Sequence, residues 1–368
     1  MRNNLTLIFS SIGHAFMHMF AAFYFVIVLA IETEWQFSYD ELISLWTLGA
    51  LLIGLGAIPS GWLSDHWSRS MMMSIMFFGM GISSIACGLC NNKFQLFICL
   101  SFLGLFCSIY HPVGIPWVIN SANKQGRALG INGIFGGVGI GSGAFVAGTL
   151  TELLNWQLAF ILPGFLSIII GFILIYLIFI DKISYKNFFI SKDKQDHSRN
   201  EMVLIAVIML LSMFALGLSF HNTQMALPKV FEIRIGNINS IQIGLIIGVI
   251  YFISGATTFL GGLLADRFNL KNIYLIGIFM QFPCYLCIAY ISGYSLIVLC
   301  IFAAIFNASI LPAENILLGR FTPQKYHGII YGIKFILAFG SGPISVFLIS
   351  EIYSITLEFT YLFLINAF

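Results

Sequence analysis

The stretch Gly61-Trp62-Leu63-Ser64-Asp65-His66-Trp67-Ser68-Arg69-Ser70 places an aspartate and an arginine between long apolar runs, in a chain that is only 9% charged. A second stretch, Gly262-Leu263-Leu264-Ala265-Asp266-Arg267-Phe268-Asn269-Leu270-Lys271, repeats its glycine, leucine and aspartate 201 positions later. Pro112 and Pro312 keep nearly the same spacing. A solenoid would repeat every 20 to 50 residues or so, and this much longer period therefore indicates a duplicated half.

The composition assigns both halves to a lipid bilayer. The 368 residues are 59% hydrophobic and 15% aromatic, with a mean hydropathy of +0.95. A helix rises about 1.5 Å per residue and the hydrocarbon is about 30 Å thick, so about 20 apolar residues cross once. We predict an all-α integral membrane protein with spans at 5–30, 41–63, 70–90, 94–119, 128–150, 156–180, 202–227, 240–264, 271–292, 294–318 and 327–350. The apolar tail 356–368 makes a twelfth span short or incomplete.

The most polar segment separates the two predicted halves. Residues 181–201 contain DKISYK and SKDKQDHSRNE, which indicates a cytoplasmic linker between a six-helix half at 1–180 and a second half at 202–368. Cytoplasmic loops retain lysine and arginine. With the N-terminus in the cytoplasm, all but four of the 17 lysines and arginines lie in cytoplasmic segments; the exceptions are Lys93, Lys229, Arg234 and Lys334.

This charge bias predicts a multi-pass protein of the cell (inner) membrane with its N-terminus in the cytoplasm. The first apolar run is long and lacks a small-residue cleavage site, so we expect it to remain as a spanning helix. The net charge of +2 comes from this loop bias, and no basic patch interleaved with aromatic residues suggests a nucleic-acid partner. We expect a monomer in the bilayer.

The two loop stretches resemble the signature of the major facilitator superfamily, which runs roughly G-x-L-A-D-R-x-G-R-K between the second and third spans. The residues that match are Gly61, Leu63, Asp65 and Arg69 in the first copy, and Gly262, Leu264, Ala265, Asp266, Arg267 and Lys271 in the second. The resemblance covers almost the whole chain and implies two six-helix halves in a parallel repeat. It also implies a gating role for these loops. The alternative is that a short cytoplasmic turn needs glycine and charge in any case.

Part of the first half resembles the fosmidomycin-resistance branch of that superfamily more closely. The motifs are Tyr110-His111-Pro112 in the fourth span and Gly126-Arg127-Ala128-Leu129-Gly130 before a glycine-rich fifth span. Exporters of the superfamily often have Gly-Pro in the fifth span, whereas Gly143 is followed here by Ala144. Uptake therefore stays open beside export.

Four histidines within predicted spans are candidates for binding a substrate or a proton. His14 and His18 share one face of the first helix, His111 follows Tyr110 in the fourth, and His221 lies in the seventh. The resemblance implies that these helices line the central cavity. An imidazole titrates near pH 6.5 and can carry a proton there, but a neutral histidine bonded to a backbone carbonyl or a tyrosine is the alternative. We expect no metal, because two ligands leave a tetrahedral site half made and the sequence identifies no companion.

Three further polar features lie inside predicted spans. The amides of Asn222 and Gln224 follow His221 and suit a hydrogen-bonding substrate, although a helix end meeting water explains them equally well. Glu314 and Lys334 are the acidic and basic residues that we place within late spans. An ion pair, a proton site, or a lysine reaching the interface each fit them.

These features predict a secondary active transporter of a small organic solute, coupled to protons and working by alternating access. Efflux of a drug or metabolite is favoured over proton-coupled uptake of a small organic acid or metabolite, and a non-transporting sensor is the other alternative. We expect neither an enzyme nor a cofactor, because no converged acid, base or metal set is identifiable. A channel fits poorly, because no filter motif or ring of charge is present.

Overall fold

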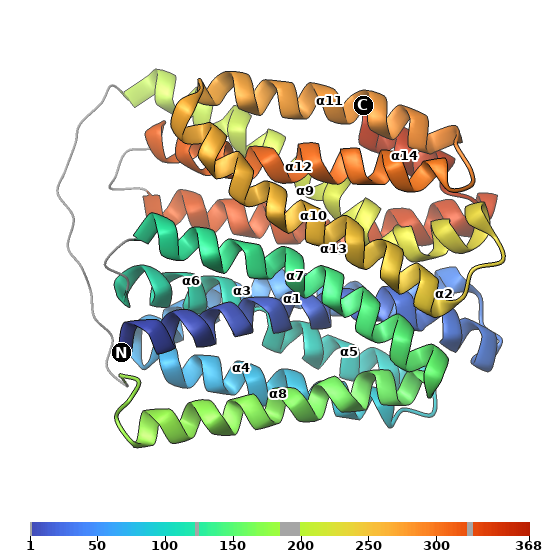
Figure 1. The fold of residues 1–368 in the computed structure, drawn as a ribbon, viewed down its shortest axis with the longest axis horizontal. Helices are drawn as coiled ribbons and strands as arrows, with labels where there is room; N and C mark the ends of the chain where they lie inside the picture. Colours follow the sequence, from blue (N-terminus) through green and yellow to red (C-terminus); the bar gives the residue numbers. More distant parts are fainter. Residues whose placement is uncertain (1, 122–124, 185–198, 322–326) are drawn as a thin grey trace.

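The computed structural model describes residues 2–121, 125–184, 199–321 and 327–368, and the regular elements in these ranges are all helices (Figure 1). The first half comprises α1 (Arg2–Trp35), α2 (Tyr39–Ser44), α3 (Thr47–His66), α4 (Arg69–Gly88), α5 (Lys93–Cys107), α6 (Tyr110–Ser121), α7 (Gln125–Leu153) and α8 (Trp156–Phe179). The second comprises α9 (Arg199–Ile235), α10 (Ser240–Arg267), α11 (Leu270–Tyr290), α12 (Ser295–Arg320), α13 (His327–Thr356) and α14 (Thr360–Ala367). The predicted linker lies mostly outside the described residues.

The helices confirm the predicted all-α membrane fold. Among the described residues, 11 segments are long and apolar enough to cross a bilayer, with α2 joined to α3 and α5 joined to α6 as single crossings. The predicted short twelfth span is α14, whose eight residues rise about 12 Å and so cross only part of the hydrocarbon. Asn92, Asn155 and Asn239 accept hydrogen bonds from backbone N–H groups at the starts of α5, α8 and α10, which fixes where these crossings begin.

The two halves lie side by side with their long helices running between the same two ends of the molecule (Figure 1). We call the end at which α8 finishes and α9 begins the linker end, and the other the opposite end. Helix α7 packs along α10, and α3 packs against α13, so each half contributes corresponding helices to the interface. At the first crossing a Cβ on Gly137 would lie 2.5 Å from the Cα of Gly255, so only glycine permits this approach.

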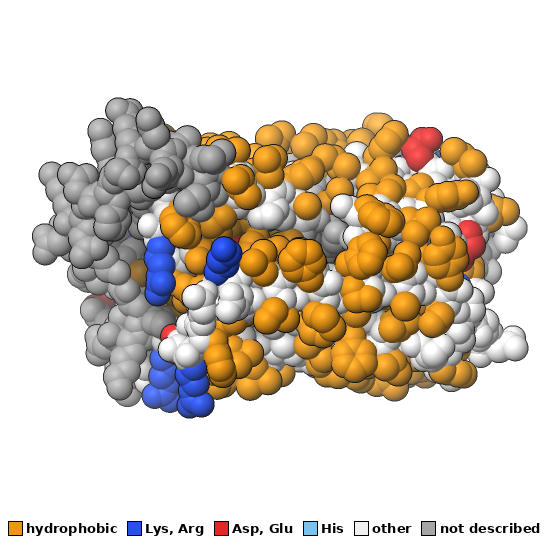
Figure 2. All heavy atoms as spheres, turned by 90° about the horizontal axis from the view of Figure 1, so that it is seen from above, with side chains coloured by type: hydrophobic (Ala, Val, Ile, Leu, Met, Phe, Trp, Pro, Cys, Tyr) orange, Lys and Arg blue, Asp and Glu red, His pale blue; other side chains and the backbone are white. Residues whose placement is uncertain are grey.

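The outer surface is suited to lipid. Large apolar side chains such as Phe172, Phe279 and Phe347 are exposed between the two ends. Figure 2 shows one face covered by hydrophobic side chains, with Lys and Arg gathered near the linker end. Because such a surface has no favourable contact with water, the chain is a multi-pass membrane protein.

Candidate functional site

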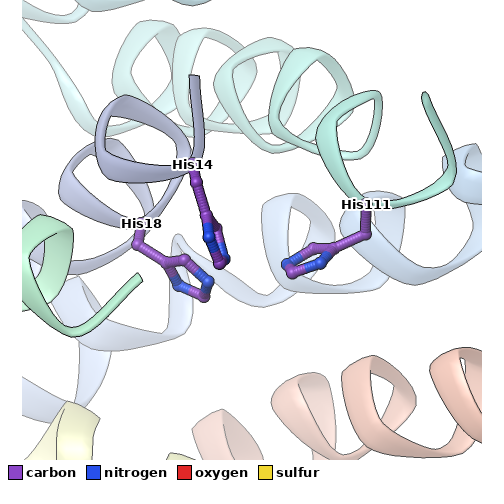
Figure 3. Close-up of side chains that lie close together, drawn as sticks. All are labelled: His14, His18 and His111. Atoms are coloured by element: carbon purple, nitrogen blue, oxygen red, sulfur yellow. The ribbon is translucent and has the colours of Figure 1, made fainter. Parts of the chain in front are cut away.

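Three of the four candidate histidines converge inside the first half. His14 and His18 extend from one face of α1, and His111 reaches toward them from α6 (Figure 3). One ring nitrogen from each lies within 4.8 Å of the others. His111 is thus the companion that the sequence did not identify for His14 and His18. The cluster consists of imidazoles alone.

A hydrogen bond to α7 fixes the orientation of His14. Its Nδ1 lies 2.7 Å from the backbone oxygen of Asn132, and a carbonyl oxygen can only accept. Nδ1 therefore carries the proton, and the lone pair of a neutral ring is at Nε2. This is the alternative arrangement expected from the sequence, a histidine bonded to a backbone carbonyl. The ring of Tyr110 stacks on the His14 imidazole, with 4.6 Å between the two ring centroids.

A buried hydrogen-bond network fixes Tyr110 and Asn132, two residues that contact His14. Tyr110 donates its hydroxyl to Asn132 Oδ1 at 2.9 Å, and Ser10 donates to the backbone oxygen of Gly114 at 3.0 Å. Asn132 Nδ2 in turn donates to Ser10 Oγ at 3.4 Å. Sequence reasoning missed both Ser10 and Asn132. The available signal was an amide side chain, Asn132, within a glycine-rich apolar helix, where a polar group needs a partner.

The cluster faces the interface between the halves. The His111 ring lies 4.9 Å from the ring of Phe339 in α13, measured between centroids. On the α7 side, a Cβ at Gly136 would lie 3.0 Å from His14 Nε2. A side chain at this position would therefore crowd that nitrogen, and glycine avoids this contact.

The polar run of the seventh span lies inside the molecule. Helix α9 continues through Pro228 to Ile235, so the predicted helix end near Pro228 is wrong, and Asn222 and Gln224 are buried away from water. Asn222 donates to Asn366 Oδ1 of α14 at 2.8 Å, so its amide holds two helices of the second half together. The buried side chain of Gln224 belongs to the same helix.

His221 is bonded within the second half. Ser341 Oγ donates to the backbone oxygen of Ala338 at 2.6 Å, so its one proton is used. His221 Nδ1 lies 2.9 Å from Ser341 Oγ. Because the hydroxyl has no further proton to donate, Nδ1–H must donate to Ser341 Oγ. This leaves His221 with the same tautomer as His14 when its ring is neutral.

Glu314 and Lys334 form an ion pair between α12 and α13. Glu314 Oε1 lies 2.7 Å from Lys334 Nζ, and their side chains are 3% and 10% exposed. Lys334 also donates to Asn315 Oδ1. Of the three arrangements considered from the sequence, the geometry is that of a buried pair. A lysine reaching the interface does not fit this burial.

The two loop copies differ in their contacts. Arg69 Nη2 lies 2.7 Å from Asp65 Oδ1, so these two residues of the first copy form an ion pair. In the second copy Asp266, Arg267 and Lys271 are exposed, and no ion pair joins them among the described residues. Ser68 and Asn269 cap the helices that follow.

The glycines of the two loop copies also differ. A Cβ at Gly61 would lie 3.3 Å from Pro112 Cβ, as expected for a close helix contact. A Cβ at Gly262 would have no neighbour within 4 Å. The close contact is made by the preceding residue, Gly261, which packs against the backbone of Ser309 in α12. Of the two repeated glycines, Gly61 therefore lies at a close helix contact and Gly262 does not.

Contacts between the halves reveal a second polar site that sequence reasoning missed. Lys229 lies within α9 and is buried, although its position after Pro228 suggested an external loop. Its Nζ is 2.7 Å from Glu32 Oε2 of α1. Near it, Ser350 donates to the backbone oxygen of Asp40 at 3.1 Å. Both contacts join the halves at the opposite end.

A cavity lies within the second half, away from the histidine cluster. It is bordered by α9, α10, α11 and α12, and its polar lining consists of Thr223, Tyr251, Ser254, Tyr285 and Asn307. The Tyr285 hydroxyl lies 3.4 Å from Thr223 Oγ1. The remaining lining is aromatic or aliphatic, so this space suits a small neutral group better than an ion.

Two helical halves that meet around buried polar groups and present an apolar surface to lipid define a class of membrane transporters. Residues 10–342 match the family model described as Major Facilitator Superfamily, so the chain belongs to that family. The fold is similar to that of a bacterial homologue of the human lysosomal transporter Spinster, solved in an inward-facing and unoccupied conformation. The TM-score is 0.74 at 15% identity, covering 93% of this chain and 81% of that one.

Two curated relatives are similar over parts of the chain. The riboflavin transporter RibZ of Clostridioides difficile (strain 630) is 30% identical over 136 residues, or 36% of this chain and 29% of RibZ. An uncharacterized transporter of Buchnera aphidicola subsp. Schizaphis graminum (strain Sg) is 24% identical over 256 residues, or 68% of this chain and 59% of that protein. The matches thus span less than two thirds of either relative's length.

Proposed function

We propose that the protein is a secondary active transporter that moves a small organic solute across the cell (inner) membrane by alternating access. One observation carries this proposal: the two halves are joined at the opposite end by separable polar contacts, namely three hydrogen bonds and the Lys229–Glu32 ion pair. Halves that meet through such contacts can rock against each other and alternate between two states. Each chain contains both halves, so a monomer suffices.

The orientation follows from charge. Lysines and arginines gather at the linker end, and cytoplasmic segments retain positive charge. This supports a cytoplasmic N-terminus and linker end. The described polar contacts between the halves then lie on the external side. The Asp65–Arg69 and Asp266 loops lie at the cytoplasmic end, where a gating role would act as that end opens and closes.

Proton coupling is assigned to the Glu314–Lys334 pair. A buried ion pair is costly to maintain in a membrane helix bundle and is typically retained for function. Protonation of Glu314 would remove the countercharge of Lys334, 2.7 Å away, and so change the contact between α12 and α13. A coupled proton could act on the second half through this step.

The proposed substrate is a small organic molecule with little charge, because the charged side chains buried among the described residues are few and each is paired. The motif at Tyr110-His111-Pro112 supports fosmidomycin as a first efflux substrate, by resemblance. The relative RibZ is named for riboflavin, so heteroaromatic compounds belong in the same panel. Uptake is the second candidate, since Ala144 stands where exporters often have proline.

The test is net accumulation of labelled fosmidomycin, riboflavin and small organic acids in cells with and without the protein, each with and without a protonophore. Proton-driven efflux predicts lower accumulation that the protonophore abolishes, and uptake predicts higher accumulation. The Glu314→Gln variant should abolish either effect, whereas Glu351→Gln, which removes an exposed carboxylate of α13, should not. A panel that shows no protein-dependent change would favour a non-transporting sensor and contradict the proposal.

A further inference from the structure

We propose that His14, His18 and His111 form a binding site for a divalent transition-metal ion such as Zn²⁺. Imidazole nitrogen is a preferred ligand of Zn²⁺, Ni²⁺ and Cu²⁺, whereas Mg²⁺ and Ca²⁺ prefer oxygen. The cluster offers three nitrogens from two helices of one half. Its ligand chemistry therefore selects a transition metal.

The spacing is close to that of a formed site. One nitrogen from each ring already lies within 4.8 Å of the others. A zinc–nitrogen bond of about 2.0–2.1 Å places tetrahedral ligands about 3.4 Å apart, so the longest of these separations would shorten by about 1.4 Å. His14 is held by its hydrogen bond, while the half-buried His18 and His111 can make this adjustment by rotating about χ2.

The surroundings of His14 are those of a metal ligand. Metal-binding histidines typically donate the second ring N–H to a carbonyl or carboxylate, which fixes the ring and leaves the other nitrogen for the metal. His14 donates Nδ1–H to the backbone oxygen of Asn132 at 2.7 Å, and glycine at position 136 avoids a side chain that would lie 3.0 Å from Nε2. The rings point toward a shared space (Figure 3).

Three protein ligands leave a fourth position for water or a substrate atom. All three come from α1 and α6, so the ion would stay with the first half when the halves move. The Glu314–Lys334 pair lies in the second half and takes no part in binding the ion. Binding of the ion can therefore be tested apart from the proposed transport function.

The test uses the full-length protein, purified in detergent without a polyhistidine tag, stripped by a chelator and dialysed against Zn²⁺ or Mg²⁺. We expect one Zn²⁺ per chain and no stoichiometric Mg²⁺. His18→Gln and His111→Gln should weaken Zn²⁺ binding about tenfold or more. The controls His66→Gln, an exposed histidine of α3, and His221→Gln, a buried histidine outside the cluster, should bind as the wild type does.

A separate variant guards against loss of folding in the ligand variants. Gly136→Ala leaves all three ligands in place but puts a Cβ 3.0 Å from His14 Nε2, so it should also weaken binding. Size-exclusion chromatography and circular dichroism would confirm that each variant is folded. Absence of stoichiometric Zn²⁺ in the wild type, or equal binding by the His18 and His66 variants, would overturn the proposal. Transport plays no part in this readout.

Discussion

Lys229 Nζ lies 2.7 Å from Glu32 Oε2 and 2.5 Å from Glu232 Oε2, so one ammonium group of α9 ties the second half to α1 of the first. The lysine side chain is 8% exposed, and its charge is also 5.4 Å from the centroid of the Tyr39 ring. Partial burial strengthens such a pair relative to one on a wet surface. Opening of the opposite end requires this contact to separate.

Glu32→Gln should favour opening of the opposite end. Lys229 keeps Glu232, so the cost is of order 1 kcal/mol, or about a fivefold change in the population of the open state. The measurement is the labelling rate of Ser350→Cys by a membrane-impermeant maleimide, with the labelled peptide identified by mass spectrometry. Ser350 bonds Asp40 across the same interface, so its exposure reports on separation.

The matched control for this experiment is Glu41→Gln. Glu41 pairs with Lys93 at 3.2 Å at the same end, but both residues belong to the first half. Its loss should leave the labelling rate unchanged. Equal rates for the Glu32 and Glu41 variants would exclude Glu32–Lys229 as a contact that holds the halves together.

Replacing Glu314 should reveal both a structural and a functional role. Glu314→Gln leaves Lys334 buried without its countercharge and should cost about 3 kcal/mol of stability, seen as a lower Tm in detergent. A double variant, Glu314→Gln with Lys334→Met, should recover much of that stability. If the pair also couples protons, the double variant recovers stability but not proton-driven transport. Recovery of proton-driven transport in the double variant would assign the pair to stability alone.

Asp65→Asn should slow turnover about fivefold while leaving equilibrium substrate binding nearly intact, because it weakens a partly exposed pair with Arg69 at the linker end. Asp266→Asn should have a smaller effect when the linker end is open, since Asp266 is exposed and unpaired among the described residues. The comparison needs initial transport rates and direct binding of the same labelled substrate. Loss of binding with normal turnover would contradict a gating role for Asp65.

The stability of the opposite end should depend on pH through Glu358. Partial burial acts to raise the pKa of this carboxyl, but hydrogen bonds from Arg234 and from the backbone N–H of Phe359 outweigh it and hold the pKa below its ordinary value. Ionised Glu358 therefore stabilises the fold above its unfolded-state pKa of about 4.3, and this contribution is lost as pH falls through the folded-state pKa.

Glu358→Gln should consequently lower the Tm near neutral pH and lessen its decline on acidification. The measurement is thermal unfolding in detergent from neutral to acidic pH. Glu351→Gln removes a nearby exposed carboxylate and should follow the wild-type curve. Parallel curves for wild type and the Glu358 variant would show that the Arg234 contact does not depend on ionisation.

Much of the fold could be predicted because each membrane helix is encoded by one continuous run of apolar residues. A run such as Trp156–Phe179 is apolar over the length of a bilayer, and the repeated loop stretches relate the halves without any knowledge of packing. Span ends were less predictable. Pro228 looked like the end of a helix, yet the helix continues, because a proline removes one backbone donor and a membrane helix can absorb that loss.

The candidate site was predictable only within single helices. The spacing of His14 and His18 placed them on one face of α1, but the approach of His111 depends on how α6 packs against α1, which periodicity does not encode. For the same reason the contact of Asn222 with Asn366 could not be inferred. The partner of a buried amide is chosen by tertiary packing.

The backbone contact between Gly137 and Gly255 has a kinetic consequence. Where Gly137 meets Gly255 the contact is between backbones, so a change of angle at this point requires no side chain of either residue to change rotamer. The rate of exchange then depends more on the polar contacts that join the halves, such as Glu32–Lys229. Substitutions at these polar contacts should alter how fast the states interconvert. A bulkier residue at Gly137 or Gly255 should slow interconversion, because its side chain would clash with the backbone of the other helix.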